Sequence, residues 1–180
     1  MLAVDDTDQL LRLENVHHHY VSDSGDVHAL DGIDLDVAAG EFVCIVGPSG
    51  CGKSTLGRLL GHLIEPTSGR VILDGKDLEA TSGAELRQLR RTIQYVFQDP
   101  YSCLNPRHSV AEIIATPLRI HGLTDGGAER VKVRELMERV GLNPEHLNRF
   151  PHEFSGGQRQ RIGVARALAL EPKLIVADEP

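Results

Sequence analysis

The sequence predicts an α/β fold in which a helical insert interrupts a core of strands and helices. Three observations predict it. An apolar run at 40–46 leads through glycines into a helical pattern, which is how an α/β unit begins. Residues 10–16 and 28–37 alternate apolar and polar side chains, as half-buried strands do. The segment "PKLIVADEP" then closes the chain as another buried strand.

Composition limits the classes of protein to consider. The 180 residues suffice for one domain with a substantial core, and 41% hydrophobic with 25% charged residues is ordinary for a globular protein. The net charge of −7 gives direct nucleic-acid binding little support. Three cysteines without metal-type spacing predict neither a disulfide framework nor a zinc site. With no signal-peptide pattern and no run near the roughly 20 apolar residues of a membrane span, we expect a cytosolic location.

The core elements follow in order along the chain. "KSTLGRLLGHL" (53–63) has a helical pattern, and "RVILDGKDL" (70–78) predicts a strand with a turn at Asp74-Gly75. Ser82 and Glu85 have capping-box spacing before a helix, and "TIQYVFQ" (92–98) predicts the next strand.

The middle of the chain, from about 100 to 153, is richer in helix signals. Ser109 and Glu112 form a second capping-box pattern, and residues 128–142 have helical periodicity. Prolines are expected to break this region into short helices; they stand at positions 106, 117, 144 and 151.

Residues 47–54 match the phosphate-loop pattern G-x-x-x-x-G-K-[ST]. Its glycines let backbone N–H groups converge on phosphate oxygens, and the start of the following helix adds partial positive charge. Lys53 can reach the β- and γ-phosphates, the Ser54 hydroxyl suits Mg²⁺, and Thr55 adds a phosphate contact. A glycine-rich turn without a ligand is the alternative. The loop consists of Gly47, Pro48, Ser49, Gly50, Cys51, Gly52, Lys53 and Ser54, with Cys51 interpreted as a small residue that fits.

Two carboxylates, Asp178 and Glu179, follow the last apolar strand. Ligands of an open parallel sheet bind outside the carboxyl ends of its strands, so a strand beside the phosphate loop would bring both to the γ-phosphate. Asp178 then suits Mg²⁺ coordination, and Glu179 is the candidate to orient or deprotonate the attacking water. The alternative is a strand that ends in two solvated acids.

The stretch "FSGGQ" opens a predicted helix with two glycines, each of which costs about 1 kcal/mol relative to alanine. A capping box between Ser155 and Gln158 is one interpretation, but it leaves Gly156 and Gly157 unexplained. A phosphate bound at the helix start explains all four residues. Because the phosphate loop already holds this chain's nucleotide, we expect a dimer in which ATP lies between two subunits.

The phosphate loop, "FSGGQ" and "LIVADE", in this order, resemble the nucleotide-binding domain of an ABC transporter over essentially the whole chain. The resemblance implies a P-loop NTPase (RecA-like) core sheet with an N-terminal antiparallel β subdomain and a helical insert that carries the signature motif. The core would span about 1–99 and 155–180, and the helical subdomain about 100–154. ATP and Mg²⁺ are the implied cofactors. Gln98 matches the Q-loop glutamine that touches Mg²⁺ or water, and Tyr20 matches the aromatic residue that stacks on adenine.

Residues 98–107 and 149–180 closely resemble the ATPase subunits of dipeptide and oligopeptide importers, with Phe154 in place of the commoner leucine. This implies an ATPase that drives peptide uptake at the cytoplasmic face of the inner membrane. Its partners would be a second ABC ATPase subunit (identical or different), integral membrane permease subunits and, indirectly, a solute-binding protein. The alternatives are an importer of nickel or another small solute, a soluble ABC ATPase that does not transport, and a binding-only module.

The chain ends before the D-loop and the switch histidine that complete family members carry. We therefore expect it to be the N-terminal part of a longer protein. On its own, it is expected to hydrolyse ATP weakly or not at all.

Overall fold

The computed structural model describes residues 9–21, 25–99, 103–124 and 126–179. The chain divides into two compact units, Met1–Arg90 and Arg91–Pro180. The sequence predicted that the helical subdomain begins near residue 100, and residues 100–102 lie outside the described residues. Strands and helices occur in both units, in agreement with the predicted α/β class.

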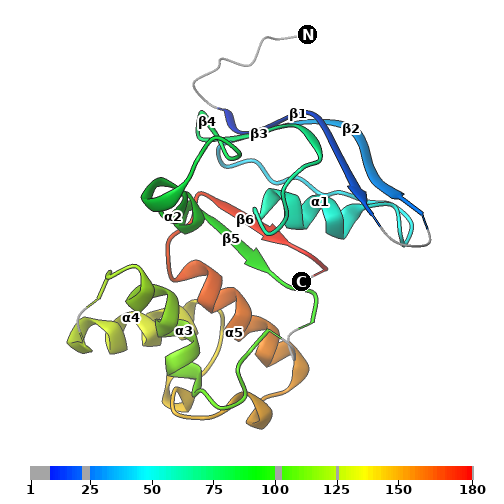
Figure 1. Ribbon diagram of the computed structural model, residues 1–180. Coiled ribbons are helices and arrows are strands. Elements are labelled where there is room, and N and C mark those ends of the chain that lie inside the picture. Colours follow the sequence, from blue (N-terminus) through cyan, green and yellow to red (C-terminus); the bar gives the residue numbers. More distant parts are fainter. Residues whose placement is uncertain (1–8, 22–24, 100–102, 125, 180) are drawn as a thin grey trace. The chain divides into compact units, whose positions relative to one another are not determined.

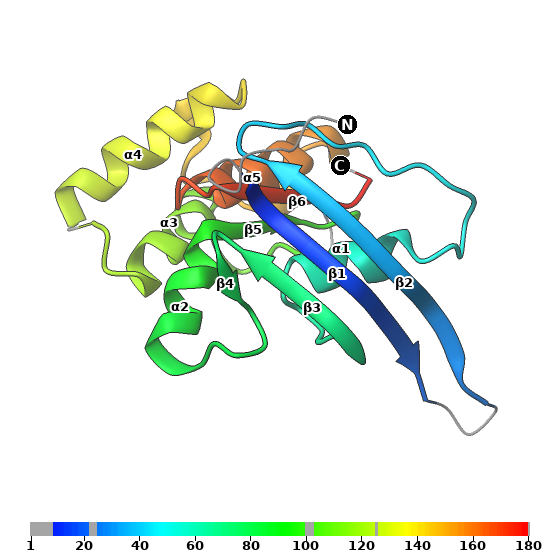
Figure 2. The same ribbon diagram turned by 90° about the horizontal axis from the view of Figure 1, so that it is seen from above.

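The first unit contains a four-stranded antiparallel sheet in the order β2-β1-β3-β4 (Figure 2). The alternation predicted for its first two strands is present: Leu11 and Leu13 of the first strand are buried while Arg12 between them is partly exposed, and in the second strand Val37 is buried next to the exposed Asp36. The N-terminal antiparallel subdomain is therefore confirmed. Its strands are β1 (Gln9–Tyr20), β2 (Val27–Ala38), β3 (Ser68–Leu73) and β4 (Lys76–Asp77).

The turn predicted at Asp74-Gly75 joins β3 to β4. Both residues have positive φ, 52° at Asp74 and 75° at Gly75. A two-residue hairpin loop with positive φ at both positions has the backbone twist that continues into the flanking strands. The local Asp-Gly signal was therefore sufficient to place this hairpin.

The strand predicted at 40–46 is not formed. Residues 41–48 form neither a strand nor a helix, and the side chains of Phe42 and Val46 are 92% and 87% exposed. A continuous apolar run becomes a buried strand only where a neighbouring strand satisfies its N–H and C=O groups. The first unit's sheet is built from β1 to β4, which leave this run unpaired within it. The helix after the loop does form, as α1 (Lys53–Leu60).

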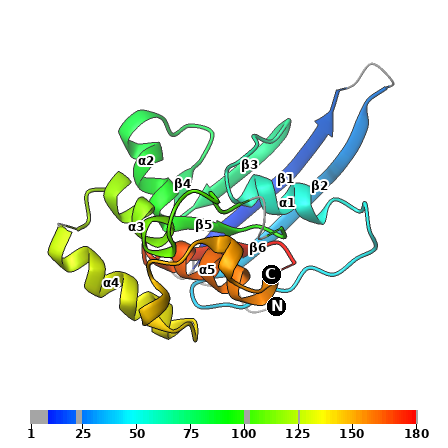
Figure 3. The ribbon, with the colours of Figure 1, turned by 90° about the horizontal axis from the view of Figure 1, so that it is seen from below.

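The second unit combines a parallel strand pair with three packed helices. β5 (Ile93–Val96) pairs with β6 (Leu174–Ala177), and a strand forms in each segment where the sequence predicted one. The prediction that the last strand is buried is wrong, because the residues of β6 alternate between partly buried and exposed. Figure 1 shows α3, α4 and α5 on one side of this pair, and Figure 3 shows them from below. The remaining bounds are α2 (Gly83–Thr92), α3 (Val110–Ile120), α4 (Gly126–Arg139), α5 (Gly156–Leu168) and the 3₁₀ helices η1 (Pro144–His146) and η2 (Pro151–Glu153).

One apolar cluster holds the three helices together. Ile114 of α3, Met137 of α4 and Ile162 of α5 are each fully buried, and Phe154 before α5 is 5% exposed. Full burial of such a side chain contributes roughly 1.5–3 kcal/mol. Phe154 therefore anchors the start of α5 in the core of the second unit.

The prolines do not act as predicted at every position. Pro144 and Pro151 stand at the first residues of η1 and η2, where a missing N–H costs nothing. Pro117, however, lies inside α3, so the expectation that it ends a helix is wrong. It removes one backbone hydrogen bond, but α3 continues for only three further residues and is stabilised by the buried cluster.

Candidate functional site

The phosphate loop adopts a backbone that needs glycine. Gly50 and Gly52 have φ of 79° and 94°, in the left-handed region. A Cβ on Gly52 would lie 2.4 Å from the carbonyl oxygen of Ala29 on β2. The loop therefore passes so close to the sheet that only glycine fits at its last position before α1.

Lys53 folds back onto this loop. Its Nζ donates hydrogen bonds of 2.8 Å to the carbonyl oxygens of Gly47 and Pro48 and lies 3.8 Å from Sγ of Cys51. Within α1, all of whose residues are described, the first turn has no acidic residue, and Gly52 supplies no side-chain cap. The helix start thus combines an ammonium group with the partial positive charge of its backbone, an arrangement that suits an anion.

Tyr20 lies beside the helix that follows the loop. Its hydroxyl is 3.4 Å from Oγ1 of Thr55, and its ring contacts the ring of His18 edge-on at 4.7 Å between centroids. The tyrosine is 39% exposed. An aromatic face held next to a phosphate loop and open to solvent can stack on a base.

The two carboxylates follow β6 at the carboxyl end of the parallel pair. The N–H of Asp178 continues the ladder with a 3.0 Å hydrogen bond to the carbonyl of Val96. Asp178 is half-buried, and its Oδ2 accepts a 3.0 Å hydrogen bond from the hydroxyl of Tyr95 on β5. The acid expected to bind metal is thus fixed at both its backbone and its side chain.

Glu179 is exposed, and its φ of 45° is strained for a residue with a side chain. Its Oε2 accepts a 2.6 Å hydrogen bond from Nε2 of Gln98. The structure therefore joins two residues that the sequence placed in the site separately, the expected Q-loop glutamine and the expected catalytic carboxylate.

Sequence reasoning did not find Tyr95. The alternation of the strand predicted at 92–98 would place Tyr95 and Phe97 on one face, and their rings do contact each other, although β5 ends at Val96. Its proximity to Asp178 depends on the register of β5 against β6, in which Tyr95 pairs with Val176. A parallel register between strands so distant in sequence carries no local signal.

The segment FSGGQ (154–158), which corresponds to the family's signature motif, forms the predicted capping box. Ser155 is the N-cap of α5, its Oγ accepts from the N–H of Gln158 at 3.4 Å, and its own N–H donates to Oε1 of Gln158 at 2.9 Å. Neither Gly156 nor Gly157 has a positive φ, and a Cβ added to Gly157 would meet no atom within 4 Å. Within the described chain, no backbone or packing requirement therefore accounts for Gly157.

The donors available for a metal are few. Among the described residues, no group of three or more His, Cys, Asp or Glu side chains could hold a metal ion. Mg²⁺ is commonly held by one or two protein oxygens together with substrate phosphates. Asp178 in the second unit carries a half-buried carboxylate and Ser54 in the first unit carries a hydroxyl, and each is a hard oxygen donor of the kind that Mg²⁺ binds.

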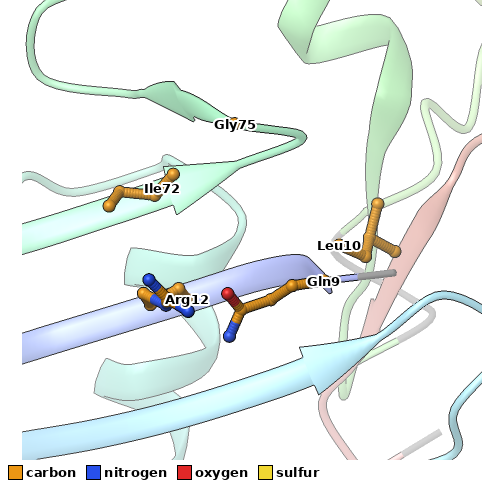
Figure 4. Close-up of a pocket in the computed structure, with 5 residues that line it drawn as sticks. All are labelled: Gln9, Leu10, Arg12, Ile72 and Gly75. Atoms are coloured by element: carbon orange, nitrogen blue, oxygen red, sulfur yellow. The ribbon is translucent and has the colours of Figure 1, made fainter. Parts of the chain in front are cut away.

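A pocket of about 230 Å³ lies on the four-stranded sheet, and none of the predicted site residues lines it (Figure 4). Its polar side chains already have partners, because Gln9 and Arg12 both hydrogen-bond to Asp36 on β2. The pocket is therefore not part of the candidate site. Its lining residues are Gln9, Leu10, Arg12, Ile72 and Gly75.

Within the described ranges, no helix has the length and apolar character that a membrane crossing requires.

Comparison with known proteins places these motifs in context. The family model described as "ABC transporter" matches residues 30–180. The oligopeptide transport ATP-binding protein OppF of Bacillus subtilis is 51% identical over 176 residues, which cover 97% of this chain and 58% of that protein. The glutathione import ATP-binding protein GsiA of Salmonella paratyphi A is 54% identical over 154 residues, 86% of this chain and 25% of that protein. The chain thus spans little more than half of the first relative and a quarter of the second.

Two solved structures share the fold. The dimeric, post-hydrolysis ATP-binding cassette MJ0796 bound to ADP and Pi has a TM-score of 0.86 and 36% identity, over 94% of this chain and 73% of that one. CbiO1 from Clostridium perfringens, part of the transporter complex CbiONQ, has a TM-score of 0.79 and 32% identity, over 96% of this chain and 66% of that one.

Proposed function

This chain belongs to the ABC transporter family, and on that basis we propose that it is the ATP-binding part of an importer subunit that uses ATP hydrolysis to drive peptide uptake. The proposal rests on three features found together: a phosphate loop whose backbone requires glycine, a hydrogen bond between Gln98 and Glu179, and a helix, α5, that begins with the residues SGGQ. In α5, no packing contact within the described chain accounts for Gly157. Relatives named for oligopeptide and glutathione import support peptides as the substrate class.

The residues divide the work of ATP binding and hydrolysis. Lys53 exchanges the loop carbonyls it now contacts for phosphate oxygens, and the N–H groups at the start of α1 bind the same phosphates. Tyr20 stacks on the adenine. Ser54 and Asp178 would hold Mg²⁺ together with the phosphates, and the ion would supply positive charge there. Glu179 accepts the proton of the attacking water, and Gln98 orients that carboxylate and the water.

The second half of the site comes from another subunit. Ser155 and the N–H groups of Gly156 and Gly157 bind the γ-phosphate of the nucleotide on the partner, and the absence of Cβ atoms lets the backbone approach. The similarity to a cassette described as a dimer with ADP and Pi supports the pairing of two such subunits. Permease subunits would hold the dimer at the cytoplasmic face of the membrane, with a solute-binding protein as an indirect partner.

The proposal is tested by transport in proteoliposomes. The full-length protein is reconstituted with importer permease subunits, a companion ATPase subunit and a solute-binding protein, and uptake of a labelled tripeptide, a labelled pentapeptide and Ni²⁺ is measured with ATP inside. Uptake of peptides by wild type, and its loss in Glu179→Gln, is expected. Uptake of Ni²⁺ alone would overturn the peptide assignment, and ATP turnover without any uptake would overturn the transport role.

A further inference from the structure

We propose that Tyr95 is a positioning residue for ATP hydrolysis, acting through Asp178. The tyrosine hydroxyl donates a 3.0 Å hydrogen bond to Oδ2 of Asp178, and both side chains are partly buried. This inference rests on the proposed function, in which Asp178 supplies a ligand to Mg²⁺. It adds a residue that lies outside the phosphate loop, the signature and the two carboxylates.

The strand register makes this contact possible. In the parallel pair, Tyr95 stands opposite Val176, and Asp178 lies two residues beyond Val176, directly after the end of β6, where its N–H still bonds to the carbonyl of Val96. Diagonal neighbours of this kind are within reach of long and aromatic side chains. The phenol spans the distance that separates the two Cα positions and ends at the carboxylate.

The ring of Tyr95 is itself fixed. Phe97, the first residue after β5, contacts it with ring centroids 4.6 Å apart and planes inclined by 51°. At the other end of the contact, the N–H of Asp178 is bonded to the carbonyl of Val96. With the backbone of Asp178 and the ring of Tyr95 both held, the hydroxyl sets the rotation of the carboxylate.

Such a constraint matters for a metal ligand. A hydrogen bond from a neighbouring side chain to a carboxylate that binds a metal orients that carboxylate, and loss of the bond typically weakens metal affinity about 10–100-fold. Without the hydroxyl, the half-buried Oδ2 loses a partner and the carboxylate can turn away from the orientation that Mg²⁺ requires. Tyr95 touches neither nucleotide nor metal in this scheme, so its effect is confined to the requirement for Mg²⁺.

The test compares Tyr95→Phe with wild type in the full-length protein. Affinity for a fluorescent ATP analogue is measured in EDTA and across a Mg²⁺ titration, and steady-state hydrolysis is measured at the same Mg²⁺ concentrations. Thr116→Val is the matched control, because it also removes one hydroxyl from the second unit, where Thr116 bonds to the carbonyl of Glu112. The pair Asp178→Asn and Asp178→Asn/Tyr95→Phe completes a double-mutant cycle.

Tyr95→Phe is expected to raise the Mg²⁺ concentration for half-maximal binding and hydrolysis about tenfold. Affinity in EDTA and turnover at saturating Mg²⁺ should stay close to wild type, Thr116→Val should match wild type throughout, and the effect of Tyr95→Phe should vanish in Asp178→Asn. An unchanged Mg²⁺ requirement, or an equal effect in the Asp178→Asn background, would refute the role of Tyr95 while leaving the ATPase assignment intact. Absence of Mg²⁺-dependent nucleotide binding in wild type would refute both.

Discussion

Replacing Gly157 by alanine separates the stability of α5 from its function. Gly157 is the second residue of α5, its φ is not positive, and an added Cβ would meet nothing within 4 Å. Alanine is about 0.5–1 kcal/mol more favourable than glycine in a helix. Gly157→Ala should therefore leave the free energy of unfolding unchanged or raise it by up to about 1 kcal/mol.

The same substitution should impair ATP hydrolysis. If a partner's γ-phosphate closes on this backbone, a methyl group blocks the approach of the N–H donors, and loss of one such donor typically lowers turnover by about 10²-fold. Urea denaturation gives the stability of the full-length protein, and phosphate release gives its turnover.

Gly163→Ala is the matched control. Gly163 lies in the interior of the same helix, and a Cβ there would also meet nothing within 4 Å. It should stabilise the protein to a similar degree and leave turnover unchanged. The reasoning would be refuted by a Gly157→Ala variant with normal turnover, or by one that lowers the free energy of unfolding.

Three further predictions concern the candidate site and the start of α3. Lys53→Ala should weaken binding of a fluorescent ATP analogue by at least about tenfold. The thermal stability should not fall, because among the contacts described Nζ bonds only to its own loop. A variant with normal affinity would show that Lys53 does not bind the phosphates. Gln98→Ala should lower turnover by roughly 10²-fold and leave the KM for ATP near wild type, because it frees Glu179 from its 2.6 Å hydrogen bond; a change in KM alone would contradict this. The pKa of Glu112 is lowered, first by the hydrogen bond from the backbone N–H of Ser109 and then by the hydrogen bond from the Ser109 hydroxyl. The contribution of Glu112 to stability is therefore present above its unfolded pKa of about 4.3 and is lost as pH falls through the lower folded pKa. Ser109→Ala should reduce the acid sensitivity of unfolding that circular dichroism measures below about pH 4.3, and an identical pH profile would count against the capping box.

Features with a local cause could be predicted from the sequence. Two of the three predicted capping boxes, at Ser109 and Ser155, form where the three-residue spacing placed them, because the groups that bond are neighbours in the chain. The Asp74-Gly75 hairpin follows for the same reason.

Features that depend on distant partners could not be predicted as reliably. The apolar run at 40–46 has the composition of a buried strand, but composition does not reveal whether a neighbouring strand is available. Pro117 stays within α3 because tertiary packing outweighs one missing hydrogen bond. The contacts of Asp178 with Tyr95 and of Glu179 with Gln98 depend on the register of two strands far apart in sequence.

The central claim is that ATP joins two subunits through the phosphate loop of one and the signature helix of the other. The mass of the full-length Glu179→Gln protein, alone and mixed with its companion ATPase subunit, tests it most directly by light scattering after size exclusion. We predict a dimer with ATP and Mg²⁺, monomers with ADP, and monomers in both cases when Gly157→Ala is added. A mass that stays monomeric with ATP, or a dimer that Gly157→Ala leaves intact, would contradict the claim.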